Sequence, residues 1–440
     1  MHFQSSRFSS QEKNIKARTM NHDMRERYAE DRNVMTDVLS IYVPTFFIMI
    51  GLSIISPILS IYAKSFGVSY ATAALAVSIY AVARLFFDIP VGVLGDRFGR
   101  RPVLLFGSFI ITVSAFLCAY AQTFWELLLY RFIQGVGSSM WQTMRVTLLQ
   151  DILRPEERGR ILSYFQAFML IGSSAGPTIG GVVAEIWGMR APFYAYGLGS
   201  LICLILSYFF IKEPRKYRSN SSQNSLAFSL ALVNQILKNA TYSAACIATL
   251  TLFFLRTGLR STLIPLYGEA ELNLNKAEIG YAISLSTLTN LLVTIPVGHA
   301  LDKFGRKIIL VPSLIATSVV AIIFSFTNSF VDLSLACILL GLSTAGGGQA
   351  SLALASDVTI EMPHGLSMGL YRVFGDVGFI IGPILVGIVS DAYGLKFPFY
   401  VVSAIVFISA IVVQLLSKET LHARKKLRSM HFNEADAYVK

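Results

Sequence analysis

Twelve long apolar stretches, separated by short polar loops, are the feature that most restricts the fold of this chain. About 20 apolar residues cross the hydrocarbon core of a bilayer as a helix, so each stretch predicts one membrane span. Only 14% of the 440 residues are charged and 54% are hydrophobic, more apolar surface than a soluble core buries. We therefore predict an all-α membrane protein with twelve transmembrane helices. They are expected at roughly 38–62, 70–94, 102–121, 125–149, 160–184, 191–211, 241–267, 279–300, 308–327, 331–355, 366–390 and 397–417.

Basic residues are concentrated in alternate loops and in the two tails, 1–37 and 418–440. Loops rich in Lys and Arg stay in the cytoplasm, which predicts a plasma-membrane protein with both termini cytoplasmic. Topology also accounts for the net charge of +11, so we expect no nucleic-acid partner. The loops on the opposite side hold only Lys64, Arg190, Lys276 and Lys396.

A loop motif occurs twice, as Gly92–Arg101 and, 206 positions later, as Gly298–Lys307. The same offset relates further Gly, Pro and Asp positions through five helices, which predicts two parallel, pseudo-symmetric six-helix bundles with a substrate path between them. The expected bundles are 38–211 and 241–417, joined by a cytoplasmic linker at 212–240. Matched pairs include Pro90 and Pro296, Asp151 and Asp357, Gly172 and Gly378, Gly176 and Gly382, and Pro177 and Pro383.

With these motifs the chain resembles the major facilitator superfamily, in its twelve-span drug:proton antiporter branch. The fourth stretch adds Arg131–Gly137, and the fifth adds the pattern associated with antiporters, Gly172, Gly176, Pro177 and Gly180. The resemblance implies alternating access by a protein that works as a monomer. It implies that Asp96 caps the eleventh helix when the cavity opens outward.

The resemblance also implies that Arg100 pairs with Asp96 and Asp151, and that the second copy of the motif repeats this arrangement. A plainer interpretation is that the basic residues only fix topology. The residues expected to act in gating are Gly92, Asp96, Arg97, Gly99, Arg100, Arg101, Asp151, Gly298, Asp302, Gly305, Arg306 and Asp357.

Charged residues inside the apolar stretches are costly unless they face a cavity or a partner. Arg84 and Asp88, and likewise Arg372 and Asp376, are spaced i,i+4, so each pair could neutralise itself within one helix. Alternatively, Asp88 and Asp376 carry the transported proton, together with Arg131, whose role in proton coupling is implied by the resemblance.

Several polar residues are expected to line a central cavity. Arg256 and Arg260 share one helix face, and this excess of positive charge favours an anionic or zwitterionic substrate over a lipophilic cation. The expected lining residues are Tyr80, Arg84, Gln142, Arg256, Arg260, Tyr267, Gln349 and Arg372.

In the fifth stretch, glycines at i+4 spacing allow close helix contact and Pro177 bends the helix. Helix packing alone would explain this pattern. The functional alternative, which we expect, places Gly172, Gly176, Pro177 and Gly180 at the interface between the bundles. Glu185, at the end of that stretch, is expected to be solvated. Gly346–Gly348 is expected to be a close helix contact.

The sequence has no spacing typical of an enzyme, a metal site or a cofactor site. The four cysteines are expected to be small core residues. The first functional hypothesis is a proton-coupled exporter of small organic molecules, with the substrate, protons and the bilayer as partners. The alternatives are an uptake carrier or facilitator for an organic anion, and a membrane sensor or scaffold that does not transport.

Overall fold

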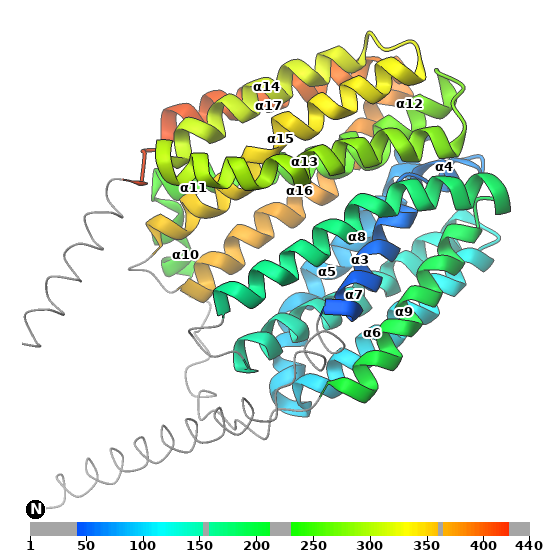
Figure 1. Cartoon of the computed structure of the whole chain (residues 1–440), viewed down its shortest axis with the longest axis horizontal. Coiled ribbons are helices and arrows are strands. Elements are labelled where there is room, and N and C mark those ends of the chain that lie inside the picture. The colour runs from blue at the N-terminus through cyan, green and yellow to red at the C-terminus, as the bar shows by residue number, and fades with distance from the viewer. Residues whose placement is uncertain (1–41, 153–157, 212–229, 360–363, 422–440) are drawn as a thin grey trace, which may run out of the picture.

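The computed structural model describes residues 42–152, 158–211, 230–359 and 364–421. Every regular element within these ranges is a helix (Figure 1). The expected N-terminal tail and most of the expected linker and C-terminal tail lie outside the described residues.

The helices of the first half form six consecutive passes. The first pass is broken at Ser56–Ile58 and consists of α3 and α4. The bounds are α3 Val43–Ile55, α4 Leu59–Lys64, α5 Tyr70–Phe98, α6 Arg100–Tyr120, α7 Phe124–Ile152, α8 Arg158–Trp187 and α9 Ala191–Phe210.

The second half repeats this order after a short helix, α10 (Leu230–Leu237), which falls inside the stretch expected to be only a linker. Its first pass is also irregular, since a π-helix, η3, replaces the middle of the seventh span. The bounds are α11 Ala240–Phe254, η3 Leu255–Leu263, α12 Ile264–Ala270, α13 Lys276–Phe304, α14 Arg306–Phe324, α15 Phe330–Val358, α16 His364–Tyr393 and α17 Phe397–Leu416.

Ten of these segments are long and apolar enough to cross a bilayer. The other two passes are α7, which has 29 residues but a more polar sequence, and the broken pass of α3 and α4. The described helices are therefore consistent with the predicted twelve spans.

The two copies of the loop motif turn the chain in a single residue. Gly99 ends α5 and precedes α6 with φ of 100°, and Gly305 does the same between α13 and α14 with φ of 119°. Side chains rarely adopt such φ values, so glycine is required at both turns. We call the end of the molecule that carries these two turns the motif end, and the opposite end the far end.

The two halves meet along two seams. Helix α5 of the first half lies against α16 of the second, and α8 lies against α13, with the first half blue to green and the second green to red (Figure 1). Because α5 and α13, and likewise α8 and α16, are related by the repeat, the seams are equivalent under the pseudo-symmetry. This arrangement confirms two parallel six-helix bundles.

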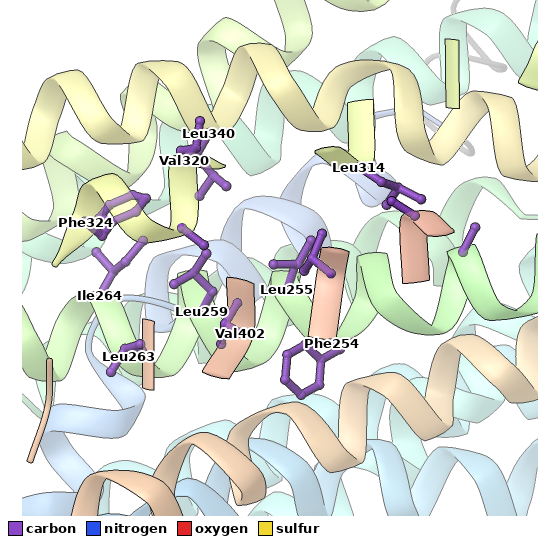
Figure 2. Close-up of a cluster of buried hydrophobic side chains, with 14 of the residues drawn as sticks. Phe254, Leu255, Leu259, Leu263, Ile264, Leu314, Val320, Phe324, Leu340 and Val402 are labelled. Carbon is purple, nitrogen blue, oxygen red and sulfur yellow. The ribbon is translucent and has the colours of Figure 1, made fainter. Parts of the chain in front are cut away.

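Each half has its own apolar core. In the second half, Leu255, Leu259 and Leu263 project from η3 into a cluster that includes Phe324 and Val402 (Figure 2). The four cysteines are buried and free, as expected.

Candidate functional site

The α5–α16 seam holds two ion pairs between the halves. Arg84 Nη2 lies 3.1 Å from Asp376 Oδ1, and Arg372 Nη2 lies 3.2 Å from Asp88 Oδ2. Of the two alternatives for these residues, pairing within one helix is not what the structure shows, because both printed pairs cross from one helix to the other. The two helices run antiparallel, so each arginine lies opposite the aspartate of the other half.

The two pairs differ in their environment. The side chains of Arg84 and Asp376 are 11% and 4% exposed, whereas those of Arg372 and Asp88 are 40% and 20% exposed. Arg372 approaches its partner without hydrogen-bond geometry. Asp88 also accepts a hydrogen bond from the Ser139 hydroxyl of α7. One pair is therefore sealed in the seam, and the other is looser and within reach of solvent.

Arg131 is buried on α7 among groups of its own half. Its Nε donates to the Ala76 carbonyl at 3.2 Å, a second guanidinium nitrogen bonds Gln134, and the guanidinium lies 4.9 Å from the Tyr80 ring centroid. No carboxylate contacts Arg131 in the part of the chain that is described. These contacts link α7 to α5. The expected role of Arg131 in proton coupling stays a proposal.

Tyr80 is part of the seam rather than an open cavity wall. Its side chain is buried, with its ring centroid 6.3 Å from that of Phe379 on α16. Its hydroxyl donates to Ser138, which also accepts from Gln142 Nε2 at 3.3 Å.

Tyr267, expected to line the cavity, lies instead in the core of the second half. It is fully buried, its hydroxyl donates to the Thr327 carbonyl at 2.8 Å, and its ring packs edge-on against Phe399. Sequence alone does not reveal which face of the seventh span is buried. Gln349, also expected there, is half-buried beside Gly298 of α13.

The glycines of α8 pack against their own half. A side chain at Gly172, Gly176 or Gly180 would overlap or crowd the backbone of α3. Of the four residues expected at the interface between the bundles, only Pro177 lies there, with its carbonyl against Gly280 of α13. An i+4 row of small residues marks a close contact, but the pattern does not say which helix makes it.

The three glycines of α15, Gly346–Gly348, do not all make close contacts. A side chain at Gly346 or Gly347 would meet neighbouring side chains within 3 Å, but one at Gly348 would meet nothing within 4 Å. The first two glycines therefore provide the expected close packing, and the third does not.

Two carboxylates link the halves at the far end. Asp391, at the end of α16, accepts hydrogen bonds from the backbone N–H groups of Tyr70 and Ala71, at 2.8 and 2.9 Å. Glu185, at the end of α8, accepts from the backbone N–H of Lys276 at 3.0 Å. Each carboxylate thus caps the first turn of a helix in the other half, where the helix dipole and free N–H groups favour negative charge.

These caps obey the repeat, since Glu185 and Asp391, and also Lys276 and Tyr70, are 206 positions apart. Glu185 is exposed, as expected, and in addition it acts as a helix cap. The signal was present in the sequence, because an acid recurs at the same position of both halves. We call the two contacts the far-end caps.

At the motif end, one face of α5 is open at Gly92. A side chain added there would meet nothing within 4 Å, and the same holds for Gly369 of α16. Asp96 is 73% exposed, and its partner among the described residues is local, with its Oδ1 2.6 Å from Arg100 Nη1. The side chain of Asp151, the other expected partner of Arg100, lies outside the described residues.

The remaining basic residues of the first motif contact neighbouring rings and backbone. The Arg97 guanidinium lies 5.4 Å from the centroid of the Phe98 ring, and Arg101 Nη2 donates to the Tyr208 carbonyl at 2.6 Å.

The second copy of the motif is bound by several contacts. Arg306 lies 3.2 Å from both Asp302 and Asp357, the arrangement that the resemblance implied. In addition, Glu419 accepts hydrogen bonds from the backbone N–H groups of Arg306 at 2.9 Å and Lys307 at 3.0 Å. We call this segment, Ser417–Leu421, the C-terminal strap. It was not predicted from the sequence.

Span one and span seven are irregular at matching positions. Ser56, where α3 ends, bonds Ser261 of η3 through their hydroxyls at 2.9 Å. Within η3, Thr262 Oγ1 donates to the Thr257 carbonyl five residues back at 2.8 Å. Interrupted helices at equivalent places in two repeats mark substrate sites in transporters, and π-helical turns recur at functional sites.

Comparisons with known proteins agree with this architecture. The family model of the Major Facilitator Superfamily matches residues 41–270 and 245–435. An uncharacterised transporter of this type from Methanocaldococcus jannaschii is 26% identical over 360 residues, 82% of this chain and 92% of its own length. The quinolone resistance protein NorA of Staphylococcus aureus is 26% identical over 385 residues, 87% of this chain and 96% of its own.

Among solved structures, a bacterial homologue of the human lysosomal transporter Spinster, in an inward-facing and occupied conformation, superposes with a TM-score of 0.75. The two share 15% identity, and the match covers 88% of this chain and 97% of the other. A peptide transporter reaches 0.74 at 12% identity, covering 89% and 97%. This chain belongs to the major facilitator superfamily, and its fold is that of a membrane transporter.

Proposed function

We propose that this protein exports a small organic molecule in exchange for protons, by alternating access, as a monomer in the plasma membrane. The observation that carries the proposal is the pair of Arg–Asp contacts that cross the α5–α16 seam. They place two ionisable acids where a change of protonation acts directly on the contact between the halves.

The conformation supports the proposal of alternating access. The far-end caps link the halves at one end, whereas toward the motif end a side chain added at Gly92 of α5 or Gly369 of α16 would meet nothing within 4 Å. With the basic motif loops in the cytoplasm, this is an inward-facing state.

The coupling step follows from electrostatics. Protonating Asp376 or Asp88 removes the negative charge that compensates the arginine opposite, which weakens the seam in this conformation. For the sealed pair of Arg84 and Asp376, losing one member costs about 3–5 kcal/mol, enough to change which conformation is populated. In the outward-facing state, Asp96 would then reach the start of α16 and take the gating role that the family resemblance implies.

Export is favoured over uptake by two observations. The fifth span carries the Gly172–Gly180 pattern associated with antiporters, and NorA, named for quinolone resistance, aligns with most of the chain. The same fold serves transporters of other solutes, so the fold alone does not give direction.

The test is transport by purified protein in proteoliposomes with an imposed pH gradient. A fluoroquinolone, ethidium and a neutral dye are added in turn, and internal pH and solute are followed together. The proposal expects proton movement with at least one solute, and reduced coupling in Asp88→Asn and Asp376→Asn. Solute flux without proton movement would instead indicate a facilitator, and full coupling in both variants would remove these acids from the mechanism.

A further inference from the structure

Arg256 and Arg260 lie on the side of η3 that the second-half core does not cover. Leu255 and Leu259 are buried in that core (Figure 2), whereas Arg256 is exposed and Arg260 is half-buried. Gly258, between the two arginines, packs closely on the backbone of Gly382 in α16. The backbone that carries both guanidinium groups is therefore held against the seam.

Neither guanidinium has a hydrogen-bonding or ion-pairing partner among the described residues. Arg256 lies within the electrostatic reach of Arg84 and Tyr80 on α5, and Arg260 within that of Arg256 and Cys337. Asp376 of the seam is already paired with Arg84. Two positive charges at membrane depth are thus left uncompensated, an arrangement expected only where a cavity or a partner supplies the opposite charge.

We infer that Arg256 and Arg260 form a subsite for a carboxylate, or a chemically similar oxyanion, of the transported molecule. Transport of the bound molecule rests on the proposed function, whereas its binding does not. A guanidinium presents paired N–H donors that match the two oxygens of a carboxylate. The irregular helix and the broken first span, joined through Ser56 and Ser261, place this subsite where the repeat is interrupted in both halves.

The experiment compares acids with matched neutral derivatives. Binding of a fluoroquinolone and its methyl ester, and of 2-naphthoate and its amide, is measured by equilibrium dialysis with the full-length protein in neutral-lipid nanodiscs. We expect each acid to bind about tenfold or more tightly than its neutral partner. We expect Arg256→Gln and Arg260→Gln to abolish the preference, and Arg256→Lys to keep part of it. Lys396→Gln, an exposed basic residue at the far end, is the matched control.

Acids that bind no better than their neutral partners, or not at all, would overturn the inference, as would an acid preference that survives in both glutamine variants. A variant that does not elute as a monodisperse peak is replaced by Arg256→Lys, whose reduced acid preference gives the same answer. Repeating the assay with phosphatidylglycerol present distinguishes a lipid phosphate from a solute, and loss of the solute preference in its presence would assign the site to lipid. Acid-selective binding without proton-coupled flux would leave the inference standing and remove the proposed function.

Discussion

The guanidinium of Arg84 and the carboxylate of Asp376 lie 3.1 Å apart on helices that belong to opposite halves of the chain. Both side chains are nearly sealed from solvent, at 11% and 4% exposure. The pair therefore links the halves at mid-depth, and a change in its charge state acts on their relative position. The pair of Arg372 and Asp88 extends the link toward the motif end.

The two ion pairs should contribute unequally to stability. We expect Asp376→Asn to lower the free energy of unfolding by about 3–5 kcal/mol, because it leaves Arg84 charged and buried. Asp88→Asn should cost about 1 kcal/mol or less, since its partner is 40% exposed and screened. Double-mutant cycles with Arg84→Gln and Arg372→Gln, measured by unfolding in mixed micelles, test this. Equal coupling energies for the two pairs would contradict it.

The far-end caps should control access to the far end. In Asp391→Asn, a cysteine placed at Ala71 should react faster with a membrane-impermeant maleimide. The substitution removes the negative charge at the N-terminus of α5, which stabilises this contact by about 0.3–1 kcal/mol. Glu185→Gln should do the same for a cysteine at Ala277. Glu126→Gln is the control, because Glu126 caps only the adjacent loop of its own half at Gln122. Unchanged labelling rates would show that the caps do not hold this end closed.

The sequence predicted which residues repeat but not what each one touches. Helix number, parallel halves and the Arg306–Asp302–Asp357 cluster followed from hydrophobic pattern, offset and family resemblance. The crossing of the ion pairs did not, because i,i+4 spacing is equally compatible with a pair within the helix and with two pairs to an antiparallel neighbour.

Substitution by alanine should have opposite effects on stability at a closely packed glycine and at a glycine with open space beside it. Gly180→Ala should destabilise the protein by about 1–3 kcal/mol or more, since the added carbon overlaps the Ile54 carbonyl of α3. Gly92→Ala should stabilise this conformation by up to about 1 kcal/mol through helix propensity, because nothing lies within 4 Å. We expect Gly92→Ala nevertheless to slow transport, by obstructing closure of the motif end. Normal transport by a stable Gly92→Ala protein would argue against that closure.

The C-terminal strap should be insensitive to pH near neutrality. Partial burial opposes ionisation of Glu419, but four backbone N–H donors outweigh it and lower its pKa below the ordinary value of 4.5. Because the pKa of Glu419 is lowered by folding, its ionised form stabilises the strap at every pH above 4.5. This stabilisation is lost only as the pH falls through the folded-state pKa. The difference in Tm between wild type and Glu419→Gln should thus be constant from pH 8 to about 5 and shrink below about 4. A difference that grows on acidification would contradict this assignment.

Other features of the site depended on tertiary packing. Tyr267 was predicted at a cavity but lies in the core, and the glycines of α8 were predicted at the interface but pack on α3. The apolar pattern of a membrane helix does not distinguish a face in contact with lipid from a face packed on another helix. Glu419 and Glu185 were missed as helix caps, although the offset relates Glu185 to Asp391 and Glu419 to Glu213. Glu213 lies outside the described residues.

The most direct test is the distance between the halves at the motif end. Spin labels at Phe98→Cys on α5 and Leu366→Cys on α16 are measured by double electron–electron resonance, with the four buried native cysteines replaced by serine. We predict one long distance at alkaline pH, and a shorter population that grows on acidification and in the Asp88→Asn/Asp376→Asn protein. A distance distribution that is the same at every pH and in both proteins would show that protonation of these acids does not move the halves.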